Sequence, residues 1–326
     1  SSKGNSSFIF SGKTSYLDKS SELFYKYPTL YFDEKGLPYS YTDLYGKVST
    51  KGKNGSKLNV FGFNFVDKVN YEGISELNWD SKGVGSEFIL IPSGSPVLIE
   101  GNFAWSSYNT ILKEFESNGT IRERSSEING YNMGMNFTYF QPKGKVKYGF
   151  EVHGFQTDYT TYNSVNSKVG IPVNTSDFSA YLNYQFNSTR WIVEPGFRLQ
   201  YYGNIGMSPE PRLGMKYIAS ERMRIKLSAG LYSQNLQSTI SDRDVVNLFT
   251  GIISTDVDLD GDYNQKLQKA QHFITGIEYD ISNKIDFQLE GYSKDFYQLI
   301  NINRNMSSDD DPQFIVESGI ANGVDA

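Results

Sequence analysis

Cysteine is absent from the 326 residues, and histidine occurs only twice, as His153 and His272. Without cysteine the chain forms no disulfide framework and offers no thiolate as a nucleophile or metal ligand. The two histidines lack metal-ligand spacing and assemble no Ser/His/Asp site with any evident partner. No Gly-rich loop precedes a helix, so a phosphate cradle is not indicated. We therefore expect a protein that is not an enzyme and requires no cofactor.

Long apolar runs and an excess of positive charge are also missing. The chain has 31 Lys and Arg against 37 Asp and Glu, a net charge of −6, which argues against nucleic acid as a partner. No stretch reaches the roughly 18 apolar residues that a membrane-spanning helix needs. The first residues, SSKGNSSFIF, lack the features of a signal peptide. The expectation is that both ends are cut from a longer protein.

Aromatic residues, by contrast, are abundant: 24 Tyr and 22 Phe bring the aromatic content to 15% while total hydrophobic content is only 38%. A soluble core normally depends on Leu, Val and Ile, whereas Tyr carries a ring and a polar edge that suit a membrane interface. A transmembrane β-barrel requires only alternating polarity, so the mean hydropathy of −0.47 does not exclude it.

Alternation with a period of two residues recurs in consecutive segments. Between 179 and 186 one face carries Ala180, Leu182, Tyr184 and Phe186, and the segments that follow repeat the pattern. Their opposite face is charged and cannot be a packed soluble core. The apolar face is therefore predicted to meet lipid and the charged face a wet lumen. The cations of that face are Arg198, Arg212, Lys216, Arg224 and Lys226.

Tight and longer connections alternate along the chain, as in an antiparallel up-and-down barrel with short turns on one side and loops on the other. The tight connections include 52–55 and 142–144, and the long ones were placed at about 16–39, 68–83, 109–125, 158–175 and 234–267. The fold prediction is an all-β transmembrane antiparallel up-and-down β-barrel over residues 1–326, with about 14 strands present.

Three features carry candidate chemistry. Asp256, Asp258 and Asp260 alternate before a turn glycine, a spacing that suits Ca²⁺ in the 256–262 loop, although a solvated acidic loop is the favoured interpretation. The cationic stripe favours anionic ligands, through Arg198, Arg212 and Arg224, or holds a plug domain through salt bridges, or is a wet wall balanced by Glu194 and Glu221. Tyr159 and Tyr162 are ligand-binding candidates in an outer loop. Tyr108, Tyr139, Tyr201 and Tyr217 are assigned to an interfacial aromatic girdle, and both histidines to the polar face.

Several phrases resemble the barrel of TonB-dependent outer-membrane receptors of the Bacteroidetes type. They include SSFIFSGKTSYLD, VLIEGNFAWSSYN, WIVEPGFRLQYYG, EPRLGMKY, RDVVNLFTG and LEGYSKDFYQLININRN, in the order expected for that family and over most of the chain. The resemblance implies a 22-stranded barrel in the outer membrane of a Gram-negative bacterium. A plug domain is expected upstream and the remaining strands downstream, both absent from this sequence.

The resemblance also implies a function: binding a scarce or large solute at outer loops and importing it with energy from the TonB–ExbB–ExbD complex, which acts through the plug. Small molecules, glycans and peptides are all candidate solutes. Outer-membrane lipids are expected to surround the wall, and a surface lipoprotein is a further candidate partner. A passive porin, or a structural or secretion-associated barrel, shares the same wall and stays open as an alternative.

Overall fold

The protein is described by a computed structural model that covers most of the chain. The described residues are 2–3, 5–24, 37–162, 167–203, 205–238, 252–254, 267–302 and 314–325. Among them, no helix is long and apolar enough to cross a membrane.

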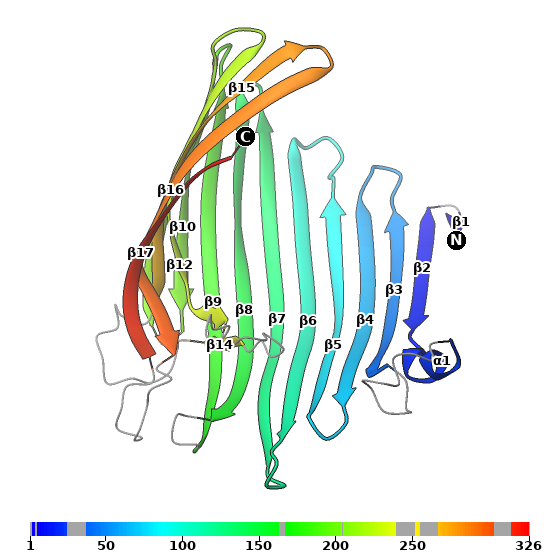
Figure 1. The fold of residues 1–326 in the computed structure, drawn as a ribbon. Coiled ribbons are helices and arrows are strands. Elements are labelled where there is room, and N and C mark those ends of the chain that lie inside the picture. The colour runs from blue at the N-terminus through cyan, green and yellow to red at the C-terminus, as the bar shows by residue number, and fades with distance from the viewer. Residues whose placement is uncertain are drawn as a thin grey trace.

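One antiparallel sheet of 15 strands dominates the molecule, and each strand pairs with the next described strand of the sheet along the chain (Figure 1). The first, β1 (Ser2–Lys3), has two residues, so 14 longer strands match the predicted number. A short helix, α1 (Leu17–Phe24), and a separate hairpin of β13 (Leu236–Ser238) and β14 (Ile252–Ser254) complete the fold. The remaining strands are β2 (Ser6–Thr14), β3 (Tyr39–Lys51), β4 (Lys57–Tyr71), β5 (Ser75–Leu90), β6 (Val97–Phe115), β7 (Ile121–Gln141), β8 (Gly144–Tyr162), β9 (Lys168–Asn187), β10 (Trp191–Tyr202), β11 (Gly206–Ile218), β12 (Met223–Gln234), β15 (Gln268–Ser282), β16 (Ile285–Ile302) and β17 (Phe314–Asp325).

Several strands are longer than the sequence predicted. The connections placed at 68–83 and 109–125 shrink to turns, because β4 and β5 continue to Tyr71 and Ser75 and β6 and β7 leave only 116–120 between them. The regular alternation of apolar residues stops at that level, yet backbone pairing continues. The extension mixes polar residues with buried apolar ones such as Leu77 and Leu112. Apolar periodicity therefore indicates the part of a strand that faces an apolar medium. It does not predict the paired extension of the strand beyond that part.

Ion pairs stabilise the extension of the β6–β7 hairpin. Arg124 Nη2 lies 3.3 Å from Glu114 Oε1, and Lys113 Nζ lies 3.8 Å from Glu123 Oε2. Opposite charges in directly facing positions favour the pairing of two strands in water. They replace here the apolar cross-strand contacts found lower in the sheet.

The outer face carries an apolar belt. On β7 it consists of five outward residues, Tyr131, Met133, Met135, Phe137 and Tyr139, and the next outward residue is Asn129. On β9 the belt is centred on Leu182, whose side chain is 54% exposed. A belt of about nine residues matches a tilted strand that crosses a bilayer.

The belt confirms most of the predicted girdle. Tyr139 and Tyr201 are both exposed on the outer face, and Tyr217 packs there against Trp191 with ring centroids 4.5 Å apart. Tyr108 is different, because it shares the inner face with buried Thr110 and Leu112. Its assignment to the girdle was wrong. The alternation in this segment is ambiguous, since Leu112 is apolar but points inward.

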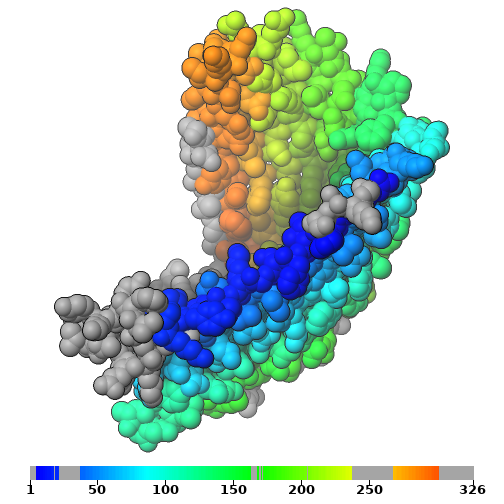
Figure 2. Space-filling model, turned by 90° about the vertical axis from the view of Figure 1, so that its right-hand side faces the viewer, coloured from blue at the N-terminus to red at the C-terminus, as the bar shows by residue number. Residues whose placement is uncertain are grey.

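The inner face is the concave side of a curved wall. Figure 2 shows the N-terminal strands, in blue, and strands β15 and β16, in orange, on opposite sides of a hollow. Polar side chains on this face meet across an intervening strand: Arg198 of β10 contacts Glu151 of β8, and the Tyr181 hydroxyl of β9 donates to Asn136 of β7. Such contacts require side chains to converge, as they do inside a curve.

Candidate functional site

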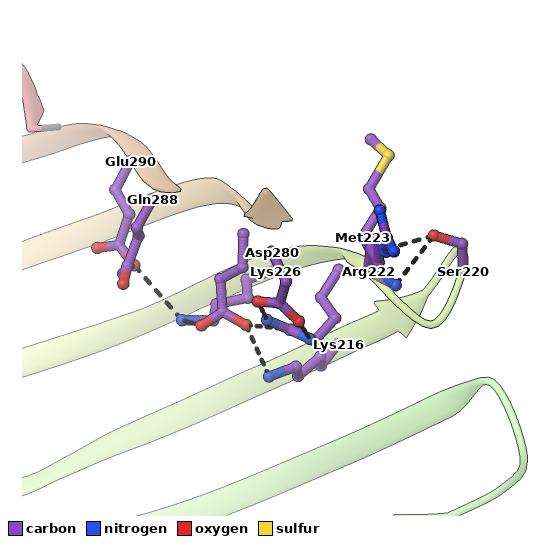
Figure 3. A network of polar contacts seen from close by, with 10 residues as sticks. Lys216, Ser220, Arg222, Met223, Lys226, Asp280, Gln288 and Glu290 are labelled. Carbon is purple, nitrogen blue, oxygen red and sulfur yellow. Dashed lines mark hydrogen bonds and ion pairs between the residues drawn. The ribbon is translucent and has the colours of Figure 1, made fainter. Parts of the chain in front are cut away.

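The predicted cationic stripe lies on the concave face, and most of its members meet in one network near the tight turn between β11 and β12 (Figure 3). Glu278 of β15 is its centre. Its Oε2 accepts from Lys216 Nζ and from Arg224 Nε, each at 2.9 Å, and its Oε1 is paired with Lys226. Arg224 is also held by Asp280, which accepts from Nη1 at 2.7 Å. One carboxylate thus gathers three cations from two strands.

Arg198 and Arg212 are paired in the same way nearer the other end of the wall. Arg198 Nη2 lies 2.8 Å from Glu151 Oε2, and Arg212 Nη2 lies 2.7 Å from Glu210 Oε2. Glu210 is 3% exposed and also accepts from the backbone and hydroxyl of Ser233 at 2.9 and 2.7 Å. A buried carboxylate with several donors is firmly positioned.

Every cation of the stripe therefore has a carboxylate partner. The arrangement supports the wall of balanced charge rather than an open anion site. The partners are Glu151, Glu210, Glu278, Asp280 and, at 3.8 Å from Lys226 Nζ, Glu290, whereas sequence analysis suggested Glu194 and Glu221. Sequence proximity selected the wrong carboxylates, because most of the true partners lie on other strands, at least 47 positions away in the sequence. Glu210 is the exception, two residues from Arg212 on the same strand.

Aromatic rings continue from Arg212 along the inner wall. The Arg212 guanidinium lies 4.7 Å from the centroid of the Tyr232 ring, and that ring lies 4.6 Å from His272. His272 in turn meets Phe296 edge-on at 6.2 Å. This places His272 on the inner face, as predicted, and His153 also lies there, opposite Asp177 in the register of β8 and β9. Sequence analysis did not identify the row, because its members come from four strands.

The two tyrosines proposed as loop ligands occupy different settings. Tyr159 is on β8 rather than in a loop, is 4% exposed, and packs in a cluster with Val173 and Leu112. It offers no open ring face in this structure. Tyr162 ends β8, where its ring lies 6.0 Å from the Arg122 guanidinium.

The root of the long connection after β12 folds inward. The Asn235 amide donates to Asp177 Oδ1 at 3.2 Å, and both residues are buried. The hairpin formed by β13 and β14 contacts β7, β8 and β9, which lie several strands from β12 in the sheet. Strand β14 therefore lies against the strands of the inner wall on which Thr157 and Ser179 are fully buried.

The predicted calcium ligands Asp256, Asp258 and Asp260 lie outside the described residues. Within the described ranges, no group of three His, Asp or Glu side chains is arranged to hold a metal ion.

No protein-family model and no curated protein sequence matches the chain. Solved structures do match its fold. A mutant of the ferric enterobactin receptor PfeA from Pseudomonas aeruginosa aligns with a TM-score of 0.64 at 11% identity, covering 99% of this chain and 54% of the receptor. The copper transporter OprC gives 0.59 at 12% identity, covering 90% and 50%. The outer membrane transporter YddB from Escherichia coli gives 0.55 at 10% identity, covering 81% and 42%.

These similarities define the fold: the chain is built like the barrel wall of outer-membrane receptors and transporters, and it spans about half the length of the structures it resembles. The predicted all-β antiparallel architecture is confirmed. The three proteins are named as a receptor and two transporters. Their names mention a ferric siderophore and copper, so the shared wall does not specify one solute.

Proposed function

We propose that the chain forms part of the wall of an outer-membrane receptor that binds a scarce or large solute at its outer side and imports it with TonB-coupled energy. The observation that carries the proposal is the two-faced wall. Its convex side is an apolar belt sized for a bilayer, and its concave side is charged, paired and suited to water.

The inner wall is suited to a rigid lumen through which a solute passes. The cations of the stripe are paired with carboxylates within the wall, so a passing solute meets a polar surface there without a strong field of one sign. The row from Arg212 through Tyr232 to His272 provides ring faces and hydrogen-bonding edges at the same level. The sequence resemblance adds four further elements to this proposal. They are an origin in the Bacteroidetes, a plug domain upstream, downstream strands that complete a 22-stranded barrel, and a surface lipoprotein that caps it.

A passive porin is the second candidate, since it shares this wall but has an open lumen. Proteoliposome swelling in L-arabinose separates the two. The full-length protein is expected to give no swelling, because a plug closes the lumen, and deletion of the residues upstream of Ser1 is expected to give rapid swelling. Rapid swelling with the intact protein contradicts the receptor proposal.

Energy coupling is tested in cells. Growth on a limiting solute that requires this protein is expected to stop when TonB or ExbB is removed, while the amount of protein in the outer membrane stays constant. Unchanged growth without TonB contradicts coupled import and favours the porin.

A further inference from the structure

The outward side of β7, β8 and β9 carries a polar hollow of about 510 Å³. Three amides form one row across the strands, because Asn129 faces Gln156 and Gln156 faces Asn174 in the sheet register. The adjacent row contains Trp105 and Tyr131. In the same row, Tyr131 faces Gly154 on β8, and Gly154 faces Ser176 on β9. The Tyr131 ring occupies the space over Gly154, where a Cβ would collide with it.

The hollow has the chemistry of a saccharide site. Amides both donate to and accept from sugar hydroxyls, and the rings of Trp105 and Tyr131, 38% and 44% exposed, offer apolar faces to the C–H side of a sugar. Among the residues that the structure describes, the side chains of Gln156 and Asn174 have no hydrogen-bond partner, and both are exposed. Their amides are therefore available to a ligand.

Charge excludes a phosphate headgroup from this position. Lysine and arginine are absent from the residues that line the hollow. In the next row along the strands, farther from the apolar belt, Glu127 lies directly opposite Asp158. The charges that flank the hollow on this side are therefore carboxylates. A bare phosphate would be repelled, whereas an uncharged sugar would not.

The height of the hollow on the wall indicates where its ligand comes from. Tyr131 is the last residue of the apolar belt on β7, and Asn129 is the first polar residue beyond it. On β9 the same transition falls between Phe178 and Ser176. The hollow therefore opens at the level where hydrocarbon gives way to headgroups, on the side that faces lipid.

An apolar groove of about 550 Å³ lies on the same three strands, within the belt. Ala180 is small, and two ring pairs flank it: Phe137 with Tyr148 at 5.1 Å, and Phe150 with Phe178 at 6.5 Å. Gln156 and Phe150 are six residues apart on β8, roughly 20 Å along a strand. That length suits an acyl chain leading down from a headgroup in the hollow.

We propose that β7, β8 and β9 bind a glycolipid of the outer leaflet, with an uncharged saccharide headgroup in the hollow and an acyl chain in the groove. The proposal rests on the membrane location stated under Proposed function. It concerns the lipid-facing side and is independent of which solute the lumen carries.

Native mass spectrometry of the full-length protein tests the proposal. The protein in detergent is given equal amounts of digalactosyl diacylglycerol and phosphatidylglycerol with the same acyl chains. The wild type is expected to retain the sugar lipid about tenfold more than the phosphate lipid, a difference of about 1.4 kcal/mol. The double variant Gln156→Leu/Asn174→Leu is expected to lose this preference, and Ala180→Phe is expected to lower retention of both lipids.

The matched control is Asn70→Leu, which replaces an exposed amide on β4, outside the hollow, and is expected to keep the preference. Equal retention of the two lipids by the wild type overturns the proposal. So does displacement of the bound lipid by millimolar free digalactose, because the site would then bind a soluble sugar. The double variant is expected to import its solute normally, because the proposed lipid site lies outside the lumen. The lipid preference and the import function are therefore tested separately.

Discussion

Lys216 on β11 and Glu278 on β15 form an ion pair of 2.9 Å across β12, the strand that separates them. The contact is possible because the wall is concave on this side, so side chains two strands apart converge. The pairing favours the interpretation of the cationic stripe as a wall of balanced charge. The same carboxylate holds Arg224 and Lys226, and Asp280 takes the second side of Arg224.

Removal of the Glu278 charge is the first prediction. Glu278→Gln leaves three cations close together without their shared carboxylate, so thermal stability of the folded wall is expected to fall by about 1 kcal/mol after allowance for solvent screening. Heat-modified migration on gels measures the loss. The loss is expected to shrink in 1 M NaCl, where the Debye length is about 3 Å. Glu194→Gln is the control, and an equal loss there contradicts the network.

Inward folding of the connection after β12 gives the second prediction. Asp177→Ala removes the acceptor of the Asn235 amide. Hydrogen exchange of backbone amides in 173–179 is expected to accelerate, because the covering hairpin is released from β9. Asp158→Ala, on the outward face of β8, is expected to leave these amides protected. Unchanged exchange in the Asp177 variant contradicts the anchoring role.

Close packing of rings on glycine gives the third prediction. At Gly85 a Cβ would lie 2.7 Å from the Phe61 ring and 3.1 Å from the Phe103 carbonyl oxygen. Gly85→Val is expected to destabilise the wall by about 1–3 kcal/mol through overpacking. Gly291→Ala meets nothing within 4 Å and is expected to be neutral. Urea titration of refolded protein in detergent compares the two, and equal midpoints refute the packing argument.

Charge on the lipid-facing side gives the fourth prediction. Leu182→Arg places a cation at the centre of the belt on β9, with an expected cost of about 2–4 kcal/mol at the bilayer midplane. Asn183→Arg, one residue on, points into the lumen and is expected to assemble normally. Outer-membrane fractions of the two variants are compared by immunoblot. Equal assembly of the variants would contradict the assigned faces.

Sequence reasoning predicted the sheet well where the chain meets hydrocarbon. Period-two alternation placed Leu182 and Tyr201 outside and Arg198 and Arg224 inside, because lipid and water impose opposite polarity on successive residues. It failed beyond the belt, where the polarity of successive residues no longer alternates regularly and apolar residues such as Leu112 are buried on the inner face. The segment at 109–125 was therefore predicted as a loop although it is a paired hairpin.

The site was harder to predict than the fold. The cations were identified, but their partners depend on register between strands far apart in sequence, as Lys216 and Glu278 illustrate. Tyr159 carried the signature of an outer loop and is instead covered by neighbouring segments. Burial by a connection that folds inward leaves no periodic signal in the chain.

The most direct test of the two-faced wall uses spin labels on single cysteines, which is straightforward because the chain has no cysteine of its own. Labels are placed one at a time at Leu182, Asn183, Tyr184 and Gln185 of the protein in bilayers, and collision with oxygen and with a water-soluble nickel complex is measured. Oxygen contact is expected to dominate at 182 and 184, and nickel contact at 183 and 185. Nickel contact at all four positions, or no contact with either reagent at 182 and 184, would contradict a wall between lipid and a wet lumen.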